Sequence, residues 1–243
     1  MATPEQPHLL LHTYFRSSCT ARVRTTLHLK SLSFEPSPIH LLKKDHQSPT
    51  YTSLNPCASV PTLTVTPKAG SPIVIRQSIA ILEFLDEYFP ESRQLLPSRE
   101  DPVARARVRE LVDVIACDVQ PPTNLRILRR VKKISNGDEE VVNTWAKEVM
   151  ESGLKAFDTL ARQYGEADEK EGNGGGRYSV GNEITMADVV LAPAVEGALR
   201  YGVDVKGMET VWGIYEGIRG LEAFKKGGWR AQEDTPEEFR EKE

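Results

Sequence analysis

The stretch RSSCTARVR, residues 16–24, places two hydroxyl groups and a thiol where an apolar run ends and a helical pattern begins. The apolar run is Leu9-Leu10-Leu11, and Val23 and Leu27 lie four residues apart on one face of the expected helix. The first turn of a helix has free backbone N–H groups and the positive end of the helix dipole. Because both stabilise an anion, and a thiolate in particular, this stretch predicts a site that holds a sulfur anion.

Composition limits the class of protein. The chain has 243 residues, 39% of them hydrophobic and 27% charged, which is typical of a globular protein with one large domain or two modest ones. Its net charge is −4 with both signs interspersed, so we expect no nucleic-acid partner. No run approaches the roughly 18 apolar residues that span a bilayer, and residues 1–7 lack the pattern of a secretory signal. We therefore expect a protein without a membrane segment.

Cysteine and histidine usage points to the same kind of protein. The chain has three cysteines, Cys19, Cys57 and Cys117, and this odd, low count argues against a disulfide framework. It favours a reducing compartment, and we expect a cytoplasmic location. The five histidines form no His-x-x-x-His or Cys/His cluster, so we expect no metal site.

The first ninety residues alternate between strand and helix patterns. Strands are expected at 9–14, 34–42, 62–65 and 73–75, and helices at 20–30 and 79–89. The order is β-α-β, a connecting segment, then β-β-α. This order predicts a small α/β domain with a mixed sheet over residues 7–91.

After Pro90 the patterns become helical only. Residues 92–100 have the composition of a linker, residues 101–230 form an expected all-helical domain, and residues 231–243 are an expected tail. Within the helical domain, an apolar stripe over residues 108–119 is followed by Pro121-Pro122, which must kink or interrupt the helix.

Further along the chain, a long helix is expected over residues 142–160, and the polar, glycine-rich residues 165–177 predict a mobile loop. The sequence Thr185-Met186-Ala187-Asp188 is a capping box that starts another helix. A last pair of helices is expected over residues 209–224.

Two dipeptides in the α/β domain suggest binding of a peptide-like ligand. Val60-Pro61 precedes a short strand, where the backbone of Val60 could pair with an extended ligand and a cis bond would turn this edge outward. The alternative is an ordinary trans proline at a strand start. Gln77-Ser78 precedes an apolar-periodic helix, and the pair could hold a carboxylate. The alternative is that Ser78 is an N-cap and nothing more.

The first stretch also has a purely structural interpretation. Ser17 or Ser18 could simply cap the helix, and Cys19 could be a small buried residue. Arg200 closes the helix that follows Asp188, where a basic residue is favourable for the helix dipole alone. Its functional interpretation is that it meets a carboxylate.

Together these stretches resemble a known family, the zeta class of glutathione transferases, over nearly the whole chain. The stretches that carry the resemblance are 14–19, 22–24, 54–56, 60–63, 77–81, 95–97, 115–116, 119–121, 124–125, 185–188 and 234–236. The resemblance implies a thioredoxin-like N-terminal α/β domain joined to an all-α C-terminal domain, the glutathione transferase fold. The Val-Pro and Gln-Ser pairs occur in many transferases, whereas Ser-Ser-Cys with Arg-Val-Arg and a downstream Gln-Pro-x-x-Asn-Leu are more specific.

The resemblance also implies residue roles. Catalysis would use Ser17, Ser18 and Cys19, with Ser18 donating a hydrogen bond to the glutathione thiolate. The implied glutathione-binding residues are Ser17, Ser18, Cys19, Arg22, Gln47, Val60, Gln77, Ser78, Gln120, Asn124, Leu125 and Arg126. The implied substrate-binding residues, which would meet carboxylates, are Arg22 and Arg200. A homodimer is implied as well.

The family reaction is a glutathione-dependent cis–trans isomerisation of 4-maleylacetoacetate to 4-fumarylacetoacetate in phenylalanine and tyrosine catabolism. A thiolate adds to the conjugated carbon, the former double bond rotates, and elimination regenerates glutathione, which acts as a coenzyme. Guanidinium groups suit the two carboxylates of this substrate because they bind bidentately. The chain departs from the family at Ala21, where a Trp is usual.

Other functions remain open on sequence alone. A wider pocket beside Ala21 could favour conjugation or dehalogenation of small α-halo acids. The chain could be a glutathione-binding scaffold without catalysis, although it keeps both the Ser and the Gln-Ser elements. A thiol exchanger that uses Cys19 as a single nucleophile is a further alternative.

Overall fold

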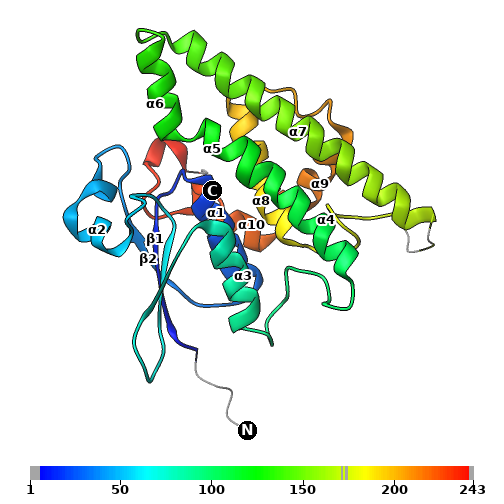
Figure 1. The fold of residues 1–243 in the computed structure, drawn as a ribbon, viewed down its shortest axis with the longest axis horizontal. Helices are drawn as coiled ribbons and strands as arrows, with labels where there is room; N and C mark the ends of the chain where they lie inside the picture. The colour runs from blue at the N-terminus through cyan, green and yellow to red at the C-terminus, as the bar shows by residue number, and fades with distance from the viewer. Residues whose placement is uncertain (1–5, 171, 173–174, 241–243) are drawn as a thin grey trace. The chain divides into compact units, whose positions relative to one another are not determined.

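The computed structural model describes residues 6–170, 172 and 175–240 (Figure 1). The chain divides into two compact units. The first unit contains residues 1–94 together with residues 222–243, and the second unit contains residues 95–221. The sequence assigned residues 101–230 to the helical domain and residues 231–243 to a tail. In this division the stretch 222–230 and the tail belong with the first unit instead.

The first unit is built on one four-stranded sheet. Its strands, β1 (His8–Thr13), β2 (Glu35–Pro38), β3 (Thr62–Thr66) and β4 (Ile73–Arg76), are ordered β2-β1-β3-β4. Strand β1 is parallel to β2 and antiparallel to β3, and β4 is antiparallel to β3, so the expected mixed sheet is present. Leu11 lies opposite Leu63, and both are fully buried, because alternate residues of a strand face the same side.

Helices complete the first unit. They are α1 (Ser18–Leu29), α2 (Pro49–Leu54), α3 (Ser78–Tyr88) and α10 (Glu222–Gly227), with a short 3₁₀ turn η1 (Asp45–Gln47) before α2. Both α3 and α10 pack against α1. Strand β2 is shorter than the expected 34–42, and Pro36 and Pro38 within it have no N–H groups to donate to a sheet.

Helices α1 and α10 approach each other closely at Gly227. A Cβ atom on this glycine would lie 2.7 Å from the backbone nitrogen of Thr25 and 2.2 Å from its Oγ1. The Nε of Arg24 donates a hydrogen bond to the carbonyl of Gly227 at 2.9 Å. Residues near the C-terminal end of the chain are therefore part of the packing around α1.

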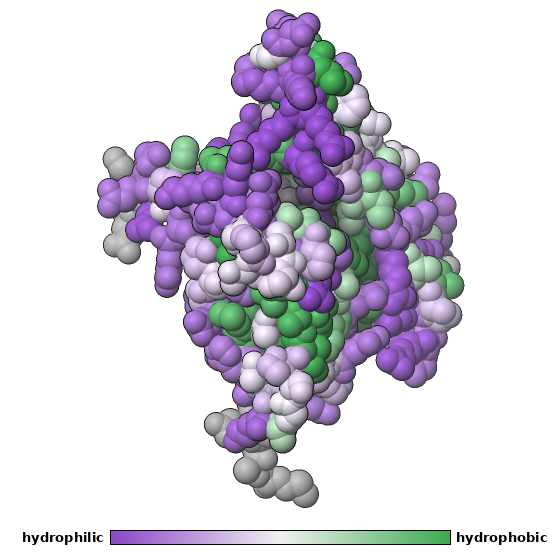
Figure 2. All heavy atoms as spheres, turned by 60° about the vertical axis from the view of Figure 1, so that its left-hand side comes forward, coloured by the Kyte–Doolittle hydropathy of each residue, from purple (hydrophilic) through white to green (hydrophobic). Residues whose placement is uncertain are grey.

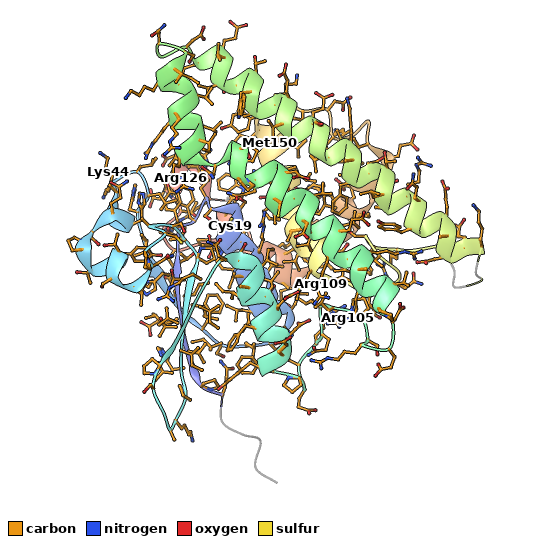
Figure 3. All side chains as sticks on the ribbon, viewed as in Figure 1. Cys19, Lys44, Arg105, Arg109, Arg126 and Met150 are labelled. Atoms are coloured by element: carbon orange, nitrogen blue, oxygen red, sulfur yellow. The ribbon has the colours of Figure 1, made fainter. Side chains whose placement is uncertain are left out.

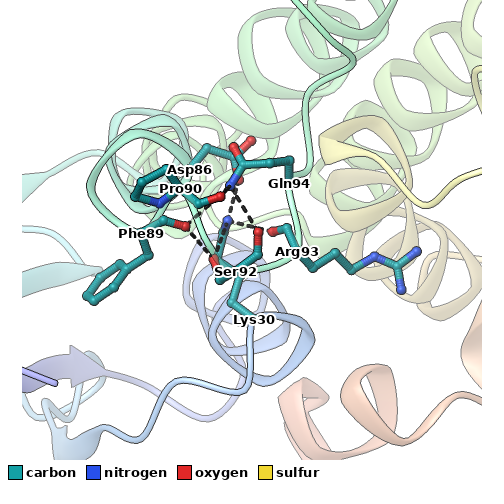
Figure 4. Close-up of polar contacts among 7 residues, drawn as sticks. All are labelled: Lys30, Asp86, Phe89, Pro90, Ser92, Arg93 and Gln94. Atoms are coloured by element: carbon teal, nitrogen blue, oxygen red, sulfur yellow. Dashed lines mark hydrogen bonds and ion pairs between the residues drawn. The ribbon is translucent and has the colours of Figure 1, made fainter. Parts of the chain in front are cut away.

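A buried ion pair joins the C-terminal end of α1 to α3 (Figure 4). Lys30 Nζ lies 2.6 Å from Asp86 Oδ1, and both side chains are at most 5% exposed. The same ammonium donates to the carbonyl of Arg93 at 2.7 Å and to Ser92 Oγ at 3.2 Å. The segment that follows α3 is thereby bonded to the end of α1, as part of the first unit.

The regular elements of the second unit, among its described residues, are all helices. Its elements are α4 (Pro102–Asp113), the π-helical segment η2 (Val114–Val119), α5 (Gln120–Thr123), α6 (Leu125–Ile134), α7 (Glu139–Lys170), α8 (Met186–Arg200) and α9 (Glu209–Arg219). The interruption expected near Pro121 is confirmed, since η2 precedes α5 and Asn124 then adopts an extended backbone. The capping box of α8 is also confirmed, with Asp188 accepting a hydrogen bond from the backbone N–H of Thr185.

The loop expected over residues 165–177 is wrong for its first part, because α7 continues to Lys170. Contacts with α4 hold the last turns of this helix. Arg107 forms an ion pair with Asp168 at 2.9 Å and lies over the ring of Tyr164, which also bonds Glu110. Residues 171, 173 and 174 of the expected loop lie outside the described residues.

The surface is mixed in character. Hydrophilic side chains cover most of the face shown in Figure 2, and a hydrophobic area lies in its lower central part. Within the described ranges, no helix combines the length and the apolar character needed to cross a membrane.

Candidate functional site

The two serines at the start of α1 have different roles. Ser17 is the N-cap, with an extended backbone, and its Oγ accepts a hydrogen bond from Thr20 N at 3.2 Å. Ser18 is the first residue of the helix, and its hydroxyl has no hydrogen-bond partner among the described residues. Cys19 follows in the same turn of α1 (Figure 3). Its side chain is half-buried. The structural interpretation of the stretch therefore holds for Ser17, while Ser18 presents a donor at a helix N-terminus.

Arg24 is completely buried and forms hydrogen bonds to residues around the start of α1. Its Nη1 donates to Thr13 Oγ1 at 2.8 Å and to Thr20 Oγ1 at 2.9 Å. Its Nη2 donates to the carbonyl of Phe15 at 3.2 Å. No role for Arg24 follows from the sequence, whose one indication is a second arginine on a helix that also has an apolar face.

The turn before β3 leaves a backbone edge open at Val60. The Val60–Pro61 peptide bond is cis, as the surrounding sequence pattern favoured. Tyr51 Oη and Asn55 Nδ2 both donate to the carbonyl of Ser59, at 2.7 and 2.8 Å, which braces the turn. Within the described part of the chain, the N–H and C=O of Val60 make no backbone hydrogen bond. These two groups can pair with an extended ligand, as a strand edge does.

The start of α3 holds a strained residue. Gln77 is its N-cap, with φ +71° and ψ 122°, a conformation that costs on the order of 1–3 kcal/mol for a residue other than glycine. The expectation that Ser78 is the N-cap is therefore wrong, because the chain enters the helix one residue earlier. Ser78 is the first helical residue and uses its Oγ as an acceptor instead.

The donor to Ser78 is Arg22, at 3.2 Å from Nη1 to Oγ. Arg22 is only 2% exposed, and its Nε has no hydrogen-bond partner among the described residues. An unpaired buried cation is costly, so a carboxylate at this position would be strongly favoured. Arg22 and Ser78 thus form one group with the free N–H groups of α3.

The other predicted residue of the first unit, Gln47, is exposed in η1. Gln77 Nε2 lies 3.9 Å from the sulfur of Cys57, a residue whose position beside the site the sequence did not indicate. The first unit therefore contains these predicted residues: Ser17, Ser18, Cys19, Arg22, Gln47, Val60, Gln77 and Ser78.

The remaining predicted residues belong to the second unit. Gln120 opens α5, and Asn124 is the N-cap of α6, where its Oδ1 accepts from Ile127 N at 3.0 Å. Leu125 and Arg126 form the exposed first turn of α6. Arg200 is the exposed last residue of α8. The structure thus gives Asn124 a capping role within its own unit.

In the described ranges, no three His, Cys, Asp or Glu side chains are grouped so that they could hold a metal ion. What the site offers is a hydroxyl at one helix start, an open peptide edge, and an arginine with free N–H groups at a second helix start. These features suit a small peptide that carries a thiol and a carboxylate.

Comparisons with known proteins agree in fold and in sequence. Residues 16–88 match the family model described as "Glutathione S-transferase, N-terminal domain". The maleylacetoacetate isomerase of Aspergillus fumigatus is 44% identical over 99% of this chain and 98% of its own length. That of Rattus norvegicus is 40% identical over 95% of this chain and 97% of its own length.

Solved structures give the same result. The crystal structure of a maleylacetoacetate isomerase from Anaeromyxobacter dehalogenans, with glutathione in its active site, has a TM-score of 0.81 and 33% identity. The match covers 96% of this chain and all of that one. A bacterial maleylpyruvate isomerase described as a zeta-class glutathione transferase also has a TM-score of 0.81, with 32% identity over 93% of this chain and 100% of its own. The chain belongs to the zeta class of the glutathione transferase family.

Proposed function

We propose that this protein is a maleylacetoacetate isomerase, which uses glutathione as a coenzyme to convert 4-maleylacetoacetate to 4-fumarylacetoacetate in phenylalanine and tyrosine catabolism. The observation that carries the proposal is the pair of serines at the start of α1. Ser17 uses its hydroxyl to cap the helix, and Ser18 leaves its own hydroxyl available beside the helix N-terminus. Two relatives that match 99% and 95% of the chain are named maleylacetoacetate isomerase, which supports the proposal.

The first unit supplies donors and acceptors for each part of glutathione. Val60 offers a free backbone N–H and C=O to the cysteinyl residue. The γ-glutamyl carboxylate suits Ser78 and the start of α3, with the buried guanidinium of Arg22 behind them. Strain at Gln77 is consistent with a residue held in place for binding.

Bound glutathione supplies a nucleophilic thiolate, so the task of the protein is to favour that anion near neutral pH. A free thiol has a pKa of ~8.5, and lowering it by about two units requires ~2.7 kcal/mol. The Ser18 hydroxyl and the unpaired N–H groups of the first turn of α1 act together in this role. Donors that are already in position need no rearrangement when the charge forms.

The two carboxylates of the substrate require cations. Arg200 is exposed at the end of α8, and we assign it to one of these carboxylates. Arg22 is buried and bonded to Ser78, so its geometry favours the coenzyme over the substrate. Substitution of Arg200 by Ala is therefore expected to raise the KM for maleylacetoacetate without changing the affinity for glutathione.

The decisive experiment is an isomerase assay of the purified protein with and without glutathione. Maleylacetoacetate is expected to isomerise only when millimolar glutathione is present, and glutathione is expected to remain unconsumed. Turnover of an α-halo acid in the absence of isomerisation would favour the conjugating alternative. Binding to a glutathione resin without either activity would favour a scaffold.

The quaternary structure and location belong to the proposal as well. We infer a cytoplasmic homodimer, in keeping with three cysteines that form no disulfide and with the family resemblance. Sedimentation equilibrium of the purified protein tests the dimer, and a mass equal to that of one chain would contradict it. Binding of glutathione by Gln120, Asn124, Leu125 and Arg126 stays a prediction, which calorimetry on single alanine variants can test.

A further inference from the structure

The last described segment of the chain, residues 228–240, is an ordered part of the first unit. We call it the tail segment. Thr235 is buried and its Oγ1 donates to the carbonyl of Trp229 at 2.5 Å. Arg240 donates to the carbonyls of Thr235 and Glu233 at 2.9 and 2.8 Å. These bonds within the tail segment fix its conformation.

One side chain of the tail segment bonds the backbone of the turn formed by residues 14–17, which we call the thiol-handling turn. Asp234 Oδ2 accepts a hydrogen bond from Phe15 N at 2.9 Å. Phe15 lies inside the turn that is closed by a hydrogen bond from Ser17 N to the carbonyl of Tyr14 at 3.0 Å. Fixing the N–H of Phe15 therefore fixes the turn that delivers Ser17 and Ser18 to the start of α1.

Aromatic contacts hold the same two pieces of chain together. The guanidinium of Arg16 lies 5.8 Å from the ring centre of Trp229 and 5.2 Å from that of Phe239, within cation–π distance of both. Trp229 also packs against the hydrophobic cluster that contains Tyr14, Phe15, Tyr51 and Val60. The tail segment thus contacts both the thiol-handling turn and the hydrophobic cluster that contains Val60.

The opposite side of the turn is bonded by Arg24, which also bonds the carbonyl of Gly227 at the end of α10. The backbone N–H of Phe15 is thus bonded by Asp234, and its carbonyl by Arg24. Asp234 belongs to the tail segment, and Arg24 is hydrogen-bonded to Gly227, which directly precedes that segment. Both polar backbone groups of Phe15 are therefore hydrogen-bonded.

We propose that Asp234 is a positioning residue, which sets the orientation of the Ser18 hydroxyl by holding the backbone N–H of Phe15. This inference rests on the proposed use of Ser18 toward the glutathione thiol. A charged acceptor at 2.9 Å forms one of the stronger hydrogen bonds to a backbone N–H. Without this hydrogen bond the thiol-handling turn becomes more mobile. The Ser18 hydroxyl then spends less time in the orientation that donates to the glutathione thiolate.

Three variants separate this role from a general effect on stability. Asp234→Ala removes the acceptor, whereas Asp234→Asn keeps an oxygen that can accept from Phe15 N. Glu238→Ala is the matched control, because Glu238 is an exposed carboxylate of the same tail segment. Each variant is made in the full chain and compared with wild type.

The first measurement needs no ligand. Hydrogen–deuterium exchange of peptides covering residues 14–20 is expected to become about tenfold faster in Asp234→Ala, the order expected for losing a hydrogen bond to a charged group. Asp234→Asn and Glu238→Ala are expected to stay near wild type. Wild-type exchange of this peptide in Asp234→Ala would overturn the proposal.

The second measurement follows the glutathione thiolate by its ultraviolet absorbance as a function of pH. In Asp234→Ala the pKa of bound glutathione is expected to rise, while the affinity for S-methylglutathione, which has no thiol, stays within about twofold. A wild-type titration, or an equal change in Asp234→Asn, would overturn the proposal. Absence of isomerase activity in the wild type would instead remove the proposed reaction and leave both measurements intact.

Discussion

Ser17 and Ser18 carry the same hydroxyl group, but only one of them is committed to the fold. The Ser17 hydroxyl accepts from Thr20 N, whereas that of Ser18 has no partner among the described residues. Cys19 lies next in the helix and is half-buried. The sulfur chemistry is therefore expected to depend on Ser18 acting on glutathione, and not on the thiol of Cys19.

Single substitutions test this assignment. Ser18→Ala is expected to lower kcat by about 10²–10³, the usual effect of removing one donor to a developing anion. Cys19→Ala is expected to retain most of the activity. Initial rates at saturating glutathione provide the measurement, with unfolding temperatures to show that both variants fold. The reverse ranking of the two variants would assign the chemistry to Cys19.

Prediction from sequence succeeded at residue scale where a side chain acts on its own neighbours. The capping box at Thr185 depends on contacts only a few residues away, and it is confirmed. The first helix begins at Ser18, two residues before the expected range 20–30, and of the two candidate caps it is Ser17 that caps it. Arg24 could not be assigned in the same way, because its partners include Gly227, which is 203 residues distant. The N-cap of α3 is Gln77 and not Ser78 because of the backbone conformation of Gln77, which cannot be predicted from the residue type.

At the scale of elements, α1 and α10 approach each other closely because Gly227 has no side chain. Gly227→Ala is expected to destabilise the protein by at least ~1–3 kcal/mol, because the new Cβ would overlap the backbone of Thr25. Chemical denaturation measures the free energy of unfolding.

A matched glycine provides the control for this prediction. Gly213 lies in the exposed surface of α9, and a Cβ there would meet nothing within 4 Å. Gly213→Ala is therefore expected to be neutral or to stabilise by up to ~1 kcal/mol, through helix propensity. If both variants behave alike, the close approach of α1 and α10 is not what determines the stability.

The ends of helices and strands are harder to predict from sequence patterns than their presence and order. The four strands and helices α1 and α3 follow from alternation and helical spacing, and they occur in the expected order, whereas α2 lies in what was expected to be a connecting segment. The end of α7 was missed because the glycine and the polar side chains of residues 165–170 favour a loop locally. Contacts of Tyr164 and Asp168 with α4 override that local preference.

At the scale of the whole molecule, ligand binding and folding are coupled. Glutathione at about 100 times its Kd is expected to add ~2.7 kcal/mol to the free energy of unfolding. For a chain of this size that corresponds to a rise in the unfolding temperature of about 5–10 °C. Thermal unfolding monitored by circular dichroism measures the rise.

The dipeptide cysteinylglycine is the control ligand for this measurement. It lacks the γ-glutamyl group that Ser78 and Arg22 are proposed to bind, so it is expected to shift the unfolding temperature much less. Equal shifts from both ligands would contradict the assignment of the α3 start to the γ-glutamyl carboxylate.

Stability is also expected to depend on pH through two histidines of the first unit. Burial lowers the pKa of His12 below its usual value. Burial also lowers the pKa of His28, helped by the positive charges of Lys226 and Arg24 and opposed by Glu222. Protonation therefore favours the unfolded chain, whose histidines titrate near 6.5, and the free energy of unfolding falls as the pH drops through that value.

Urea denaturation at pH 7.5 and 5.5 tests this sign. Each histidine can contribute at most ~1.4 kcal/mol per pH unit. His28→Gln is expected to reduce the loss of stability at the lower pH. A stability that rises as the pH falls would contradict the prediction.

The first unit is made from both ends of the chain, with residues 95–221 inserted between its two parts. Its sheet is complete once residue 76 has been synthesised, yet Gly227, Trp229 and Asp234 leave the ribosome only after the entire helical unit. The thiol-handling turn is therefore finished last during translation, although it is encoded near the beginning. A nascent chain stalled before residue 222 would carry the serines without the contacts that hold them. Expression of the first unit on its own would accordingly require residues 222–240 to be joined to residues 1–94 through a new connection.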